Sequence, residues 1–163
     1  MGTLHDFPKG TMAIGRLDEN SEGLLLLTTN GKVSELVRSK KIEKEYFVQL
    51  DGEINMEAVE QLKEGVEISV NKKKYLTLPS EVRQLNPAPI FSPPIKERGE
   101  SHGPTSWISI TIREGKFRQV RKMSAAVGFP TIRLVRVRIG RIYLKNIKPA
   151  EVVEVDNFKL SPK

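Results

Sequence analysis

Apolar and polar side chains alternate, or recur at helical spacing, in short stretches along the whole chain. Helical spacing together with helix-end residues predicts three helices, over 32–38, 56–64 and 117–127. Alternation and β-branched content predict strands, whose ranges are 45–50, 66–70, 75–78, 81–85, 106–112, 131–139, 143–144 and 152–155. We therefore expect an α+β fold in which a few helices flank a sheet.

Two further stretches have less regular patterns. Four consecutive leucines, 24–27, lead into two threonines and stand between turn residues, which favours a strand buried on both faces, although periodicity alone leaves a helix open. Residues 86–104 are rich in proline, serine and glycine, and we expect an inserted loop there. Strand patterns continue on both sides of this loop, so we expect one domain over residues 1–163.

The composition excludes several kinds of site. The chain has no cysteine, which excludes disulfides, thiolate metal ligands and cysteine nucleophiles. Its two histidines lie far apart in the sequence, so we expect no metal. No apolar run approaches the ~18 residues that span a bilayer, and the first residues lack the basic and apolar parts of a secretory signal. We expect a cytoplasmic protein that has no membrane partner.

The charge is concentrated in one part of the chain. The protein has 27 Lys and Arg against 20 Asp and Glu, a net charge of +7. Between residues 113 and 141 the only acidic residue is Glu114, and the basic residues are Arg113, Lys116, Arg118, Arg121, Lys122, Arg133, Arg136, Arg138 and Arg141. Such a cluster indicates a partner that carries phosphate groups, as nucleic acids do.

One carboxylate stands where catalytic residues are often found. Asp18 follows the stretch 11–17, whose loose alternation favours a strand, and lies on a polar turn that ends at Gly23. A carboxylate on such a loop can act as a nucleophile or a general base, but it can equally bond its own backbone in an Asx turn. A calcium loop is excluded because its twelfth position, which must be acidic, is Thr29.

Two other motifs add candidate side chains. Tyr46 lies in a predicted strand, where a tyrosine can be part of the core or face a site. Arg118, Arg121 and Lys122 stand at i, i+3 and i+4 of a predicted helix and would share one face. Such a basic face can bind phosphates, pair with a buried acid, or simply lie in solvent.

Taken in order, these motifs resemble those of the RsuA-type pseudouridine synthases. Residues 15–31 resemble that family's aspartate motif, and residues 44–48 resemble its tyrosine motif. Residues 114–123, with the Leu134-x-Arg136 that follows, resemble its basic motif. The stretches 93–98 and 104–107 look most like the RluE branch, which modifies large-subunit ribosomal RNA. The resemblance covers nearly the whole chain and implies a mixed, mostly antiparallel sheet.

The resemblance also implies roles for single residues. Asp18 matches the catalytic aspartate, Tyr46 the tyrosine that stacks on the target base, and Arg121 the basic residue that pairs with the aspartate. The pocket residues would be Arg16, Leu17 and Leu134. The residues expected to bind RNA are Arg113, Lys116, Arg118, Lys122, Arg133, Arg136, Arg138 and Arg141. The implied reaction converts uridine to pseudouridine in ribosomal RNA and needs no cofactor or metal.

Two family features are not found in the sequence. We do not find the Asn-Lys-Pro-like strand that precedes the aspartate motif, so we expect the domain to lack its first strand. We also expect no S4 RNA-binding domain, and a monomer. Two other functions stay open, namely a synthase that acts on transfer or small-subunit ribosomal RNA and an RNA-binding domain that has lost turnover.

Overall fold

The computed structural model describes residues 6–91 and 103–160. The histidines at 5 and 102 and the central part of the predicted 86–104 loop, 92–102, therefore lie outside the described residues. The fold is α+β, as expected, with one large sheet and three helices among the described residues.

The large sheet is mixed and mostly antiparallel, which confirms the expected sheet type. Its strands stand in the order β10 (Ile142–Tyr143), β9 (Thr131–Ile139), β4 (Lys44–Asp51), β8 (Thr105–Ile112) and β7 (Glu81–Gln84). A short strand, β2 (Glu22–Gly23), pairs in parallel with β9. Two small pairs lie outside this sheet, β1 (Met12–Ala13) with β3 (Leu27–Thr28) and β5 (Glu67–Val70) with β6 (Lys73–Leu76).

Two helices begin where the local sequence predicts. The side chain of Asn30 accepts hydrogen bonds from the first turn of α1 (Gly31–Arg38), and Asn55 accepts one from the amide of Ala58 in α2 (Met56–Glu64). Gly65 ends α2 with a φ of 108°, a left-handed conformation that favours glycine. α3 (Gln119–Ala126) is shorter than the predicted 117–127, because Arg118 has a φ of 52° and stands before the first helical residue.

Two strand predictions are wrong. The leucine run forms no continuous strand, since only Leu27 joins β3, and Leu25 is 43% exposed while Leu24 and Leu26 are buried. The segment 152–155 forms no strand either, and Val152, Val153 and Val155 are exposed. The leucine run passes from β9, where the Leu24 amide donates to the Arg136 carbonyl, to the short β1–β3 pair, and so it does not continue along one neighbour.

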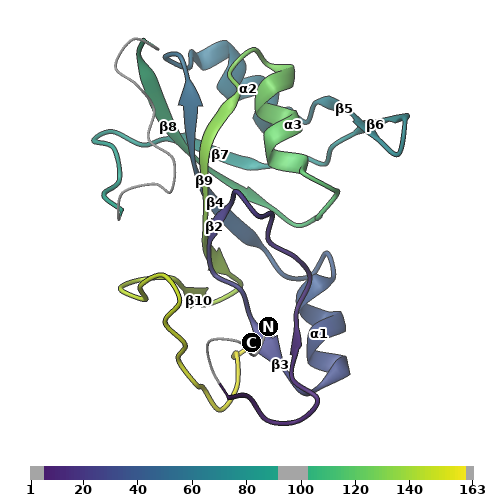
Figure 1. Cartoon of the computed structure of the whole chain (residues 1–163). Helices are drawn as coiled ribbons and strands as arrows, with labels where there is room; N and C mark the ends of the chain where they lie inside the picture. The colour runs from purple at the N-terminus through teal and green to yellow at the C-terminus, as the bar shows by residue number, and fades with distance from the viewer. Residues whose placement is uncertain (1–5, 92–102, 161–163) are drawn as a thin grey trace.

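The apolar side chains form two separate cores. The larger core lies between the sheet and helices α2 and α3 and includes Leu50, Leu62, Ile108 and Met123. The smaller core lies beside α1 and includes residues from both ends of the described chain, such as Ile14 and the partly buried Leu160. Figure 1 shows α2 and α3 at one end of the molecule and α1 at the other, with β4 and β9 running between them. The long strands therefore connect the two cores.

Candidate functional site

A pocket of about 380 Å³ opens where the two cores meet. Its apolar wall combines Val120 and Leu134 of the larger core with Ile14, Val37 and Ile139 of the smaller one. Five of the six residues predicted as catalytic or pocket residues line this pocket: Arg16, Leu17, Asp18, Tyr46 and Leu134. They come from the 15–23 loop, from β4 and from β9, so the fold brings together segments that are far apart in the sequence.

Asp18 stands between two arginines. Its Oδ2 lies 3.5 Å from Nη1 of Arg118 and 3.9 Å from Nε of Arg121. Both separations are ion-pair distances rather than short hydrogen bonds, and the Asp18 side chain is 24% exposed. The carboxylate is therefore surrounded by positive charge and still reachable from the pocket. The predicted partner Arg121 is present, and Arg118, which the sequence assigned to RNA binding, lies closer.

Arg121 holds the loop that carries Asp18. Its Nη2 donates to the carbonyl of Asn20 and to Oγ of Ser21, each at 3.0 Å. The Arg121 side chain is only 12% exposed and lies behind the loop, outside the pocket lining. Burial and the neighbouring Arg118 lower the pKa of Arg121, whereas Asp18 raises it. Arg121 thus positions the Asp18 loop by hydrogen bonds as well as by charge.

The other end of this loop is fixed to β9. Glu22 accepts two hydrogen bonds of 2.7 Å from the Arg133 guanidinium, and the amide of Leu24 donates to the carbonyl of Arg136 at 2.9 Å. Gly23 has a φ of 105°, and a Cβ there would stand 2.2 Å from the Arg136 carbonyl oxygen. Only glycine lets the two backbones approach so closely, so Gly23 fixes how near Asp18 lies to β9.

The floor of the pocket is the face shared by β4 and β9. Tyr46 pairs with Arg136, and Lys44, two residues earlier on the same face, pairs with Ile139. Lys44 and Arg136 both line the pocket. Burial, then the charges of Arg136 and Arg113, lower the pKa of Lys44 to about 8.

A buried carboxylate supports the wall on the α3 side. Glu114 is 4% exposed and accepts hydrogen bonds from the Tyr75 hydroxyl, from the amide of Leu78 at 2.7 Å and from Nε2 of Gln119 at 3.0 Å. These three donors come from β6, the chain after it and α3. Glu114 therefore ties the β5–β6 hairpin to the segment that leads into α3 and carries Arg118.

The model of the RNA pseudouridylate synthase family matches residues 3–126, which is most of the chain. The chain belongs to the RNA pseudouridylate synthase family.

Relatives within the family are similar over most of this chain. A protein from Vibrio parahaemolyticus named ribosomal large subunit pseudouridine synthase E is 42% identical over 94% of this chain and 64% of its own length. A protein of the same name from Xanthomonas axonopodis pv. citri is 41% identical over 90% of this chain and 78% of its own. A crystal structure titled pseudouridylate synthase is 28% identical, with a TM-score of 0.68 over 86% of this chain and 54% of that one. The chain thus spans somewhat less than two thirds of the Vibrio relative.

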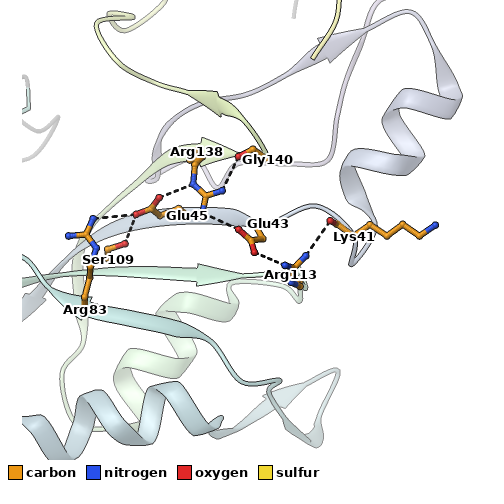
Figure 2. A network of polar contacts seen from close by, with 8 residues as sticks. All are labelled: Lys41, Glu43, Glu45, Arg83, Ser109, Arg113, Arg138 and Gly140. Atoms are coloured by element: carbon orange, nitrogen blue, oxygen red, sulfur yellow. Dashed lines mark hydrogen bonds and ion pairs between the residues drawn. The ribbon is translucent and has the colours of Figure 1, made fainter. Parts of the chain in front are cut away.

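Several basic residues of this family member are already paired with acids. Figure 2 shows a network on the sheet face that carries Glu45, in which Arg138 lies between Glu45 and Glu43, at 2.9 and 3.3 Å. Arg113 pairs with Glu43 at 2.5 Å, and Oε2 of Glu45 also accepts from Ser109. Burial raises the pKa of Glu45, but Ser109 and Arg138 lower it below the usual value overall. RNA contact by Arg113 and Arg138 stays a prediction.

The remaining predicted RNA-binding residues are placed differently. Lys116 and Arg141 are exposed, and Lys122 and Arg118 are partly exposed near the pocket rim. Phe117, 56% exposed, has Arg16 and Lys122 over its ring at 5.8 and 5.4 Å from the centroid. A basic and aromatic rim of this kind is typical of surfaces that bind single-stranded nucleic acid.

Sequence reasoning missed three residues of this synthase-family pocket. Lys44 and Glu114 were quoted as parts of the tyrosine and basic motifs but were given no role. Arg136 was predicted to bind RNA but was not placed in the pocket. The spacing of Lys44 and Tyr46 on one strand was the available signal, because alternate residues share a face. The burial of Arg136 and Glu114 had no local signal.

The described residues contain no cluster of three or more acidic or histidine side chains that could bind a metal ion. Among the same residues, no helix is both long and apolar enough to cross a membrane.

Proposed function

We propose that this chain isomerises a uridine to pseudouridine in large-subunit ribosomal RNA, with Asp18 as the reacting carboxylate. The observation that carries the proposal is the placement of Asp18, between Arg118 and Arg121 and at the edge of a pocket whose floor is Tyr46 and Leu134. The names of the Vibrio and Xanthomonas relatives, which are about two-fifths identical in sequence, support the choice of substrate.

The reaction needs a carboxylate and a closed space for the base. The bond from N1 of uracil to C1′ of ribose breaks, the base turns within the pocket, and C5 bonds to C1′. The proton on C5 leaves and N1 ends with a proton, so substrate and product are isomers. Asp18 either bonds to the nucleoside during this exchange or removes a proton on the way to a glycal intermediate. Both routes need an ionised carboxylate close to the sugar.

The pocket walls give the detached base a place to stay. Tyr46 offers an aromatic face, and stacking on such a face is worth about 1–3 kcal/mol per base. This offsets part of the cost of taking the uridine out of its helix or loop. Leu134 is buried beside the pocket, and Leu17 and Arg16 stand on the loop across from it. An apolar wall of this kind keeps water from the reacting bond.

We propose that the rim residues hold the RNA backbone. Lys116, Lys122 and Arg141 show no ion pair within the described residues and can reach phosphates freely. Arg118, which lies 3.5 Å from Asp18, would contact the phosphate next to the pocket. We also propose that residues 1–163 act as one catalytic domain, as a monomer and in the cytoplasm.

The proposal is tested on large-subunit ribosomal RNA that lacks modifications, with pseudouridine mapped at nucleotide resolution. The wild-type chain is expected to modify a defined site, Asp18→Asn to give no product, and the exposed neighbour variant Glu19→Gln to behave as wild type. Product from Asp18→Asn would refute the role of the carboxylate. Product only on transfer or small-subunit RNA would refute the substrate. Binding without product on any RNA would favour an RNA-binding domain without turnover.

A further inference from the structure

One side of the pocket is lined by cations that have no carboxylate partner among the residues that the structure describes. Arg136 is only 7% exposed; its Nε donates to the carbonyl of Leu24 at 2.9 Å, and its Nη2 has no hydrogen-bond partner in the described part of the chain. Lys44 donates from Nζ to the carbonyl of Ser39 at 3.2 Å. Arg38, at the end of α1, lines the pocket beside them.

The carboxylates that line the pocket are engaged elsewhere. Asp18 lies at ion-pair distance from Arg118 and Arg121. Glu114 accepts hydrogen bonds from Tyr75, Leu78 and Gln119. Buried charge is costly unless it is paired. Burial, and after it the charge of the neighbouring Arg136, lowers the pKa of the Lys44 amine. Within residues 6–91 and 103–160, the positive charge on this side is thus left without a carboxylate partner.

The missing partner must be an anion that accepts several hydrogen bonds. A phosphate group meets both needs, since its oxygens can accept from an arginine fork and a lysine at once. Lys44 and Tyr46 are alternate residues on one face of β4, and Arg136 is the residue opposite Tyr46 on β9. A phosphate held there lies next to the face on which the base would stack.

We propose that Lys44, Arg136 and Arg38 form a phosphate subsite that holds the backbone phosphate of the target nucleotide. The inference rests on the proposed function for the identity of that nucleotide, but the subsite itself depends only on the arrangement of the three cations. It gives Lys44 and Arg136 a binding role within the pocket, separate from the reacting carboxylate and from the cations of the rim.

Binding of small ligands tests the subsite without any turnover. Uridine 5′-monophosphate and uridine are titrated into the full chain by calorimetry, slightly above neutral pH, where the phosphate is a dianion. The wild type is expected to prefer the monophosphate by about tenfold, the size of one charge-assisted hydrogen bond. Lys44→Gln is expected to reduce this preference to about threefold or less, and Lys44→Arg to restore it.

The controls separate the subsite from general charge effects. Lys63→Gln on α2 removes the same charge from a side chain that is 41% exposed, outside the pocket lining, and is expected to keep the wild-type preference. Inorganic phosphate, followed by NMR, is expected to shift the signals of residues 44, 46 and 136 in the wild type but not in Lys44→Gln. An equal preference in Lys44→Gln and wild type, or equal losses in Lys44→Gln and Lys63→Gln, would overturn the subsite. A wild type that shows the preference but modifies no RNA leaves the subsite standing and refutes the proposed function.

Discussion

Replacing Gly23 by alanine is expected to displace the loop that carries Asp18. Gly23 lies in β2 and faces the backbone of Arg136, and an added Cβ would stand 2.2 Å from its carbonyl oxygen and 2.6 Å from its nitrogen. Both atoms belong to the main chain of a central strand and cannot turn away as a side chain could. The loop must therefore move, and the Leu24 amide bond to the Arg136 carbonyl, 2.9 Å, is lost or lengthened.

The magnitude follows from two costs. A non-glycine residue at a φ of 105° is strained, which costs of order 1–3 kcal/mol, and overpacking a close contact costs about 1–3 kcal/mol more if the backbone shifts. A loss of about 3 kcal/mol in the free energy of unfolding corresponds, in a domain of this size, to a melting temperature lower by about 6–12 °C. A carboxylate displaced by about 1 Å can lose about 100-fold in rate.

Two measurements check this reasoning. Thermal unfolding gives the stability, and tritium release from RNA labelled at C5 of uridine gives the rate, since that hydrogen leaves when pseudouridine forms. Gly31→Ala is the matched control, because a Cβ at the first residue of α1 meets nothing within 4 Å; alanine there is expected to stabilise slightly, by up to about 1 kcal/mol. Wild-type melting and turnover in Gly23→Ala would refute the argument that this contact sets the position of Asp18.

Three further predictions concern the neighbours of the pocket. Arg121→Lys keeps the charge but loses the fork that holds the loop, so tritium release is expected to fall about tenfold or more while RNA affinity stays within about threefold; a wild-type rate contradicts this. Glu114→Gln weakens three hydrogen bonds to a buried group and is expected to cost about 2 kcal/mol in thermal unfolding, whereas unchanged melting contradicts it. The pKa of Lys44 is about 8 in the native state against 10.5 for the free side chain. Between these two pH values the unfolded chain therefore keeps a proton on Lys44 that the native chain has released. The wild type is therefore expected to gain stability relative to Lys44→Gln, in urea unfolding, as the pH rises from about 7 to about 9.5; a constant difference contradicts it.

The sequence predicted elements whose signals are local. Both ends of α2 follow from Asn55 and Gly65, which fix the helix cap and the left-handed stop in the residues next to them. The long strands β4, β8 and β9 follow from alternation, which survives because each strand has one face on the core. The leucine run carried no such information. Four identical side chains have no polar face. In the fold, the backbone of Leu24 bonds to Arg136 and that of Leu26 to Ile14, while the side chain of Leu25 between them is exposed.

The placement of the β9 arginines needed the structure. Arg136 and Arg138 have the same parity, so alternation puts them on one face. The register of β4 against β9 shifts between Glu45 and Tyr46, which pair with Arg138 and Arg136 and leave Val137 unmatched. Such a bulge moves the two arginines to different surroundings: Arg138 bonds Glu45 in the network of Figure 2, and Arg136 lines the pocket. A shift of register has no signal in the sequence of either strand.

The pairing of cations with acids leads to a last prediction, on how salt weakens RNA binding. Arg113 and Lys116 are three residues apart and both exposed, but Arg113 pairs with Glu43 at 2.5 Å, whereas Lys116 lies over the Tyr75 ring and has no ion pair within the described chain. Only a cation that neutralises a phosphate releases counterions. Each such contact steepens the slope of log K against log salt concentration by about 0.7–0.9. Lys116→Gln is therefore expected to flatten that slope by about this amount, and Arg113→Gln by less than half of it. Both variants lose one positive charge, so equal slopes would show that net charge, rather than pairing, governs RNA binding.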